Sequence, residues 1–208
     1  MKILTFSDFH GLFGLIDHYI DVKKKIEQYH PDLLLLCGDL QDRGSVKLLE
    51  NRIHNLQFSP IFFVWGNSEE QVDPSYELKN AINIHLKIKN IADLHFIGLG
   101  GDEYDVRGNI SEIRRIILDN PLKGEQLILI SHIPPYKSVD LCNDGRNVGV
   151  IEYRDLITEF QPMLVICGHV HEEVQKIAYI DSSMICNVGS RGVLFTIKNN
   201  NITTLMLD

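Results

Sequence analysis

The chain has 208 residues, a formal net charge of −8 at pH 7, 44 % hydrophobic residues and 23 % charged residues. This composition is typical of a globular protein, and the length suits one domain spanning residues 1–208. A strong nucleic-acid-binding face is not expected, because it needs a basic patch, and the run Lys23–Lys25 is predicted to lie on a solvated helix face. We expect a cytoplasmic protein without a membrane partner, since the N-terminus lacks a leader pattern and no apolar run reaches the roughly 20 residues that cross a bilayer.

The first third of the chain alternates apolar strands with amphipathic helices. Strands are predicted at residues 1–7, 33–37 and 61–65. Helices are predicted at 12–29 and from Ser45 to Leu56, because apolar side chains recur there every three or four residues. Ser45 suits the N-cap position. A β-α-β-α-β order implies parallel strands joined by right-handed crossovers.

The rest of the chain predicts a second group of strands. Strands are expected at 86–91, 94–99, 126–131 and 163–167, and helices at 110–118 and 150–160. Pro74 is expected to open a short helix, Asp102 and Glu103 to lie in a solvated loop, and 137–148 to form a surface loop near the strand ends. The tail predicts antiparallel strands at 174–180, 184–188, 193–197 and 202–207, with a hairpin turn at 199–201.

The four cysteines form neither a disulfide framework nor a zinc pattern. Cys37, Cys167 and Cys186 belong to apolar runs and are predicted to be small buried side chains. Cys142 lies in a polar stretch, which indicates an exposed thiol.

Five apolar strands end in side chains that bind metals. These side chains are Asp8 and His10, Asp39, Asn67, His132, and finally His169 and His171. Strand ends in α/β sheets are where ligands bind, because the loops there converge on one crevice. Seven ligands exceed what one tetrahedral zinc requires, and they suit two metals that share one carboxylate, most naturally Asp39. Ligation by His, Asp and Asn without thiolate fits Mn, Fe, Zn, Ni or Co without choosing among them.

The same residues, with a glycine before Asp39, Asn67 and His169, resemble the calcineurin-like metallophosphoesterase family. The resemblance runs from residue 8 to residue 171 in the family's order. It implies an α/β fold, a four-layer α-β-β-α sandwich of two mixed sheets. It also implies two ligand sets: Asp8, His10, Asp39 and His171 for the first metal, and Asp39, Asn67, His132 and His169 for the second.

The resemblance further implies a dinuclear metal-dependent phosphoesterase acting on a small phosphate ester. Two cations about 3.5–4 Å apart, with manganese favoured, would hold a bridging hydroxide for in-line attack on phosphorus. Asp39, Asn67, His132 and Arg43 are the predicted catalytic residues. Arg43 resembles the phosphate-gripping arginine of protein phosphatases, although a surface role is equally open. Asp42 would either support the loops that carry the ligands or only cap the loop in which it lies.

One departure from the family concerns Ser68, which stands where the family usually carries a histidine that supports the leaving group. The nearer resemblance is to a small phosphodiesterase-like branch, so hydrolysis of phosphodiesters is favoured. A phosphomonoesterase acting on phosphoprotein and a non-catalytic scaffold are the alternatives, and the intact ligand set argues against the scaffold. A homo-oligomer is left open. The other histidines receive ordinary structural roles: His18, His30, His54, His85 and His95.

Overall fold

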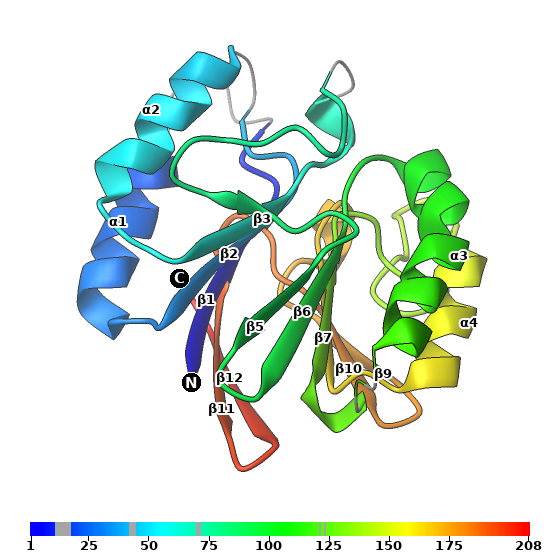
Figure 1. Cartoon of the computed structure of the whole chain (residues 1–208). Helices are drawn as coiled ribbons and strands as arrows, with labels where there is room; N and C mark the ends of the chain where they lie inside the picture. The colour runs from blue at the N-terminus through cyan, green and yellow to red at the C-terminus, as the bar shows by residue number, and fades with distance from the viewer. Residues whose placement is uncertain (11–17, 42–44, 70–71, 121, 123) are drawn as a thin grey trace.

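The computed structural model of the chain describes residues 1–10, 18–41, 45–69, 72–120, 122 and 124–208. Within these ranges the strands form two six-stranded sheets (Figure 1). Sheet 1 has the order β12 (Asn201–Met206), β11 (Val193–Lys198), β1 (Lys2–Phe6), β2 (Leu33–Cys37), β3 (Ile61–Val64), β4 (Ile82–Asn83). Sheet 2 has the order β5 (Ile88–Ile91), β6 (Leu94–Leu99), β7 (Leu127–Ser131), β8 (Leu164–Cys167), β10 (Ser183–Asn187), β9 (Ile177–Ile180).

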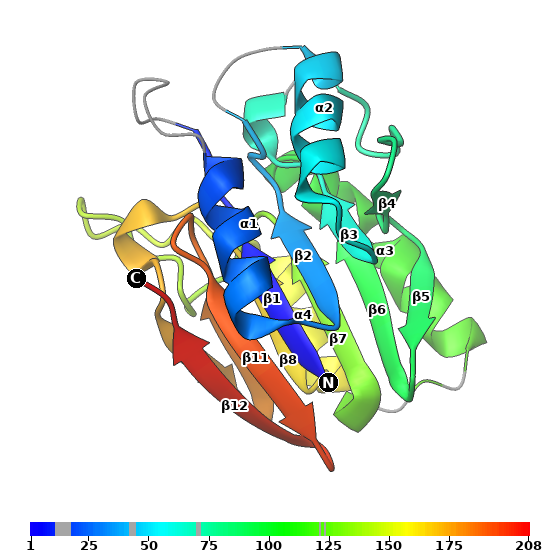
Figure 2. The ribbon, with the colours of Figure 1, turned by 90° about the vertical axis from the view of Figure 1, so that its left-hand side faces the viewer.

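Helices cover the outer face of each sheet, as Figures 1 and 2 show. Helices α1 (His18–Tyr29) and α2 (Val46–Leu56) lie on sheet 1, and α3 (Glu103–Asp119) and α4 (Ile151–Phe160) lie on sheet 2. Three apolar clusters fill the interfaces: one between the sheets, one under α1 and α2, and one under α3 and α4. The predicted four-layer α-β-β-α sandwich is therefore confirmed. The leucine run of β2 is fully buried because both faces of its sheet are covered.

Both sheets are mixed. Strands β1, β2, β3 and β4 are parallel, whereas β11 runs antiparallel to β1. The antiparallel tail is confirmed for the pairs β9–β10 and β11–β12. The tail also makes a pairing that the sequence did not predict, because β10 lies parallel to β8. The chain then crosses from sheet 2 to sheet 1 between β10 and β11, so the tail joins the two sheets.

The prediction of a solvated loop at Asp102 and Glu103 is wrong. Helix α3 begins at Glu103, and Asp102 caps it by accepting hydrogen bonds from the backbone N–H groups of Tyr104 and Asp105. The Asp105 carboxylate accepts from the backbone N–H of Asp102, which completes a capping box. These reciprocal bonds satisfy donors that the first helical turn leaves unpaired, so the helix starts seven residues before the predicted 110.

Three other predicted elements differ from the structure. Residues 72–80 form turns, so the short helix expected at Pro74 is absent from this described stretch. Strand β5 begins at Ile88 because Leu86 has a φ of 53°, which extended backbone does not allow. Strand β9 begins at Ile177 because Gln175 has a φ of 60°.

Two side-chain expectations can also be compared with the fold. Lys25 is buried, not solvated: its Nζ lies 2.5 Å from Asp21 Oδ2 and donates to the carbonyl of Arg191. Cys37, Cys167 and Cys186 are buried as predicted, and Cys142 is half-buried. Among the described helices, none combines the length and apolar character that crossing a bilayer requires.

Candidate metal centre

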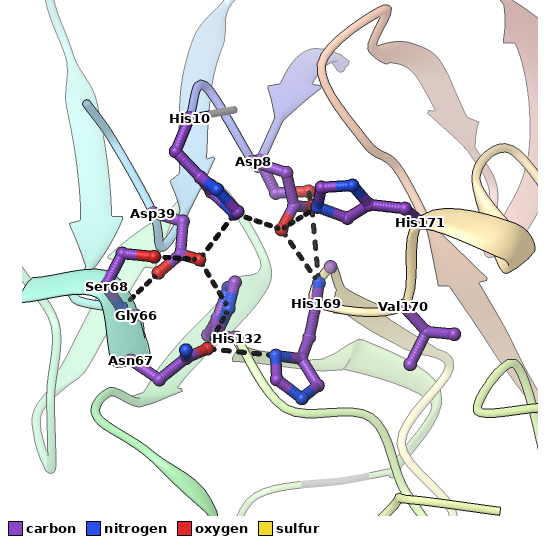
Figure 3. A network of polar contacts seen from close by, with 12 residues as sticks. Asp8, His10, Asp39, Gly66, Asn67, Ser68, His132, His169, Val170 and His171 are labelled. Carbon is purple, nitrogen blue, oxygen red and sulfur yellow. Dashed lines mark hydrogen bonds and ion pairs between the residues drawn. The ribbon is translucent and has the colours of Figure 1, made fainter. Parts of the chain in front are cut away.

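All seven predicted ligands lie in loops at one end of the sandwich, and they face one another there (Figure 3). Asp8 and His10 follow β1, Asp39 follows β2, and Asn67 begins the 3-10 turn η1 (Asn67–Glu69) after β3. His132 follows β7, and His169 and His171 follow β8. The parallel strands bring these ends together, because parallel neighbours finish at the same edge of a sheet.

Three of these residues adopt left-handed backbone conformation. The φ angles are 59° at Asp8, 53° at Asp39 and 73° at His169. Such a conformation in a residue other than glycine costs about 1–3 kcal/mol and persists only where the surroundings enforce it. Each of the three is held by a neighbouring loop: the backbone N–H of Asp8 donates to the carbonyl of Gly38, that of Phe9 to the carbonyl of Asp39, and that of His169 to Asp8 Oδ1. The strained backbone turns each side chain out of its strand into the site.

Three ligand loops begin with a glycine that packs against a ligand or its partner from another loop. A Cβ on Gly66 would lie 2.2 Å from Asp39 Oδ1, and one on Gly38 would lie 2.6 Å from His132 Nδ1. A Cβ on Gly168 would lie 2.4 Å from Ser7 Oγ and 2.5 Å from Asp8 Oδ2. Contacts this short leave no room for any side chain. The three glycines therefore allow loops from both sheets to meet.

Four donor groups contact the carboxylate of Asp39. Its Oδ2 lies 2.8 Å from His10 Nε2 and 3.3 Å from His132 Nε2. Ser68 donates its backbone N–H to Oδ1 and its hydroxyl to Oδ2, both at 2.8 Å. Burial favours the protonated carboxyl, but the hydrogen bonds from His10 and His132 outweigh it and hold the pKa of Asp39 well below its usual range.

His132 is fully buried and oriented at both ring nitrogens. Nδ1 lies 2.9 Å from the carbonyl oxygen of Cys37, and Nε2 lies 2.9 Å from Asn67 Oδ1. Burial lowers its pKa, but the hydrogen bond and charge of Asp39 prevail and raise it to about 9. A carbonyl only accepts, so Nδ1 carries a proton and Nε2 is the atom that can bind a cation.

His169 and Asn67 complete this side of the site. His169 Nδ1 lies 2.9 Å from Asn67 Oδ1, so one amide oxygen faces two imidazoles. Burial, together with the charge of neighbouring His132, lowers the pKa of His169 to about 4. The ring is therefore neutral near pH 7, which is the state that binds metals.

Asp8 is held chiefly by a hydroxyl and a backbone amide. Ser7 Oγ donates to its Oδ2 at 2.5 Å, and the backbone N–H of His169 lies 3.0 Å from Oδ1. The imidazoles stand further away, with His10 Nε2 at 3.9 Å and His171 Nε2 at 3.8 Å from Oδ1. The carboxylate oxygens of Asp8 and the imidazole nitrogens of His10 and His171 therefore border one space.

These distances fit divalent cations. Two groups have all their ligand atoms within 4.8 Å of one another: Asp8, His10 and His171, and Asp8, Asp39 and His132. Bonds to N and O ligands are about 2.0–2.2 Å long, so atoms separated in this way can share one ion. The donor chemistry fits as well, since His132 Nε2 lies 3.3 Å from Asp39 Oδ2 and 2.9 Å from Asn67 Oδ1, so one cation there would contact all three. Asp8 belongs to both groups, which spacing along the chain did not indicate.

The sequence did not single out Glu69, which organises two of the ligand loops. This buried carboxylate accepts hydrogen bonds from the backbone N–H groups of Gly66, Asp39 and Leu40. Burial, followed by the negative charge of Asp39, raises its pKa. Glu69 thereby ties the loop after β3 to the loop after β2. No pattern in the chain separates Glu69 from adjacent Glu70, so only the tertiary structure identifies it.

Other predictions at this end have mixed outcomes. Asp42 and Arg43 lie outside the described residues, so their proposed roles stay predictions. Of the five histidines given ordinary roles, His85 is buried, and its Nδ1 accepts the backbone N–H of Gly100. None of the five belongs to a candidate metal group among the described residues.

Comparison with known proteins defines the class to which this fold and site belong. The model of the calcineurin-like phosphoesterase family matches residues 1–173. The chain belongs to this family, whose members are metal-binding hydrolases.

Individual relatives are distant but match most of the chain. An uncharacterized protein of Methanocaldococcus jannaschii is 26 % identical over 99 % of this chain and 95 % of its own length. A 3',5'-cyclic-nucleotide phosphodiesterase of Nostoc sp. is 26 % identical over 82 % of this chain and 69 % of its own. The crystal structure of TT1561 of Thermus thermophilus superposes with a TM-score of 0.68 at 16 % identity, covering 100 % of this chain and 99 % of that one, which shows the same fold.

Proposed function

We propose that this protein is a dinuclear metal-dependent phosphodiesterase. The observation that carries the proposal is the convergence of seven oxygen and nitrogen donors, from both sheets, at one end of the sandwich (Figure 3). The relative from Nostoc, named a cyclic-nucleotide phosphodiesterase, supports the choice of diesters. The donor set lacks thiolate and favours ions such as Mn²⁺, although Fe, Zn, Ni and Co fit it too.

In this proposal the seven residues form two ligand sets that share Asp39. Its Oδ2 lies 2.8 Å from His10 and 3.3 Å from His132, one imidazole of each set. The first set is Asp8, His10, Asp39 and His171, and the second is Asp39, Asn67, His132 and His169. When bound, the two cations would lower the pKa of water and neutralise charge on the phosphate. The net charge of −8 is then no obstacle to an anionic substrate, because the ions dominate the local field.

The protein's own residues orient the substrate. The side chains of His10 and His171 are 26 % and 52 % exposed, whereas those of Asp8, Asp39 and His132 are nearly or fully buried. A phosphate ester would therefore approach past His10 and His171, and the buried carboxylates would remain inaccessible to bulk water. Arg43 is proposed to hold phosphate oxygens with its planar guanidinium.

Ser68 supports a preference for good leaving groups. Its hydroxyl donates to Asp39 Oδ2, so the hydroxyl proton is engaged in orienting a ligand. A serine is also a far weaker acid than the histidine that most family members carry at this place. Without general-acid help the leaving oxygen must depart as an anion, which costs about 10²–10⁴-fold for basic leaving groups.

A substrate panel tests the proposal. Purified protein is stripped with a chelator, reloaded with Mn²⁺, and assayed on aryl phosphodiesters, aryl phosphomonoesters and cyclic nucleotides. We expect hydrolysis only after reloading and a higher kcat/KM for diesters. Preference for monoesters would instead support a phosphomonoesterase, and metal binding without hydrolysis of any ester would support the scaffold alternative. A cytoplasmic location is part of the proposal and is supported by the four unpaired cysteines.

A further inference from the structure

A sixth strand end adjoins the site and carries no predicted ligand. Strand β10 ends at Asn187, which pairs in parallel register with Cys167 at the end of β8. Asn187 is fully buried, and both of its backbone groups are bonded: its N–H donates to Lys176 and its carbonyl accepts from Gln175. Its side chain is therefore fixed directly beneath the loop that carries His169 and His171.

The amide of Asn187 grips this loop at two points. Nδ2 donates to the carbonyl of Gly168 at 3.1 Å and to the carbonyl of Val170 at 2.8 Å. These carbonyls belong to the peptide units that immediately precede His169 and His171. A single NH₂ group thus fixes the orientation of both peptide planes from which the two imidazoles extend.

The loop needs such a restraint. His169 has a φ of 73°, and Gly168 packs so tightly on Ser7 and Asp8 that a Cβ would not fit. Its amides are already engaged, since Gly168 N–H donates to the carbonyl of His132 and His169 N–H to Asp8. Each of the two carbonyls also accepts a backbone N–H from within the same segment, Gly168 from Val170 and Val170 from Glu173. Asn187 is the donor that ties both carbonyls to strand β10, so without it the loop would be free to relax toward an unstrained backbone.

We infer that Asn187 is a positioning residue for the metal centre: it holds His169 and His171 in place through the carbonyls of Gly168 and Val170. It touches neither substrate nor metal. This inference rests on the proposed function, because it presumes that the two histidines bind a cation. Groups that orient metal ligands typically contribute about 10–100-fold to metal affinity.

Asn83 offers a matched control. It is also fully buried, ends strand β4, and donates its Nδ2 to two loop carbonyls, those of Pro74 and Tyr76. Those carbonyls belong to a loop without predicted ligands. Asn187→Leu removes two hydrogen bonds and Asn83→Leu removes three, because Asn83 Oδ1 also accepts the backbone N–H of His85. Both changes roughly conserve volume, so a general loss of stability affects the control at least as much.

The experiment titrates metal-free protein with Mn²⁺ by calorimetry. We expect Asn187→Leu to bind about 10–100-fold more weakly than the wild type, whereas Asn83→Leu binds normally despite a comparable fall in Tm. Hydrogen exchange in metal-free protein is expected to rise across residues 168–173 only in the Asn187 variant. Wild-type affinity in Asn187→Leu, or equal weakening in both variants, overturns the inference.

A second variant covers the case in which Asn187→Leu does not fold. Asn187→Ser retains one donor and a smaller volume, so we expect it to fold and to lose an intermediate share of the affinity. If it binds Mn²⁺ as the wild type does, the inference is overturned. If the wild type itself binds no Mn²⁺, the proposed function fails. Failure of the inference alone gives a different result, because the wild type then binds Mn²⁺ and Asn187→Leu binds it equally well.

Discussion

Asp8 and Asp39 leave neighbouring parallel strands at equivalent points and with the same left-handed backbone, yet their carboxylates have different surroundings. Asp39 is bonded to two imidazoles and to both donors of Ser68. Asp8 is bonded to Ser7 and to the backbone of His169, with His10 and His171 nearly 4 Å away. Asp39 is therefore oriented by Ser68 and by two imidazoles that we propose as metal ligands, whereas Asp8 is oriented chiefly by a hydroxyl and a backbone amide.

The sharpest test of this comparison replaces each carboxylate with its amide. Asp39→Asn is expected to lower occupancy of both metal sites and to reduce kcat by at least about 10²–10³-fold, because the shared negative charge is lost. Asp8→Asn is expected to empty chiefly the site formed with His10 and His171. Metal content by mass spectrometry and hydrolysis rate measure both effects. Two bound metals and full activity in Asp39→Asn would show that Asp39 is not the shared ligand.

Gly66 packs against Asp39 and Gly168 packs against Asp8, so a substitution at either glycine disturbs one of the two carboxylates. Gly66→Ala would force a methyl group onto Asp39, and Gly168→Ala onto Ser7 and Asp8. A displacement of about 1 Å can cost about 10²-fold in rate, so we expect losses of this order in both variants. Gly108→Ala is the control, since a Cβ there meets no atom within 4 Å in helix α3. It should stabilise the fold by about 0.5–1 kcal/mol and leave activity unchanged.

Ser68 donates two hydrogen bonds to Asp39, and a histidine in its place would restore the family's usual residue. Ser68→His is expected to raise kcat on alkyl esters by about 10-fold or more, with little gain on aryl esters, because only basic leaving groups need a proton. The ratio of the two rates in wild type and variant measures the effect. Equal aryl and alkyl rates in the wild type would contradict the expectation.

The two hydroxyls that contact the carboxylates should differ in their contribution to stability. Ser7→Ala removes a fully buried hydrogen bond to a charged group, and we expect the free energy of unfolding to fall by about 1.5–3 kcal/mol. Ser68→Ala is expected to cost less, because Asp39 keeps the backbone N–H of Ser68 and both imidazoles. Urea titrations of metal-free protein compare them. A larger loss in Ser68→Ala would reverse the order we infer.

The smallest effect concerns His85, a buried histidine that forms no ion pair with any other described residue. Burial lowers its pKa below 6.5, although Asp105 and Asp73 oppose the shift and Lys87 adds to it. The unfolded chain therefore binds a proton at His85 before the folded protein does, so stability present above pH 6.5 should decline as the pH falls below it. His85→Asn can still accept the Gly100 N–H. As the pH falls, the free energy of unfolding of this variant should decline less steeply than that of the wild type, by at most about 1.4 kcal/mol per pH unit. An unchanged profile between pH 7 and 5 would assign the acid sensitivity to other groups.

Several features of the site had a signal in the chain and others had none. The buried strands and the donors that follow them lie within a few residues of one another, so their local pattern predicted both. The start of α3 was also readable, because Asp102 and Asp105 have the spacing of a capping box. Glu69 and Asn187 had no comparable signal, since an acid or an amide near a strand end is usually solvated. Their burial depends on loops contributed by distant parts of the chain.

Local hydrophobic runs and the residues that end them indicated an α/β chain, the donor set and its order along the sequence, whereas the four-layer sandwich was implied only by the resemblance to the family. The tertiary structure alone decided which donors meet. Asp8 and His169 are 161 residues apart, and their contact exists because packing of sheet 1 on sheet 2 brings the ends of β1 and β8 together. The parallel pairing of β10 with β8, which places Asn187 under the His169 loop, likewise follows from long-range packing that no local pattern encodes.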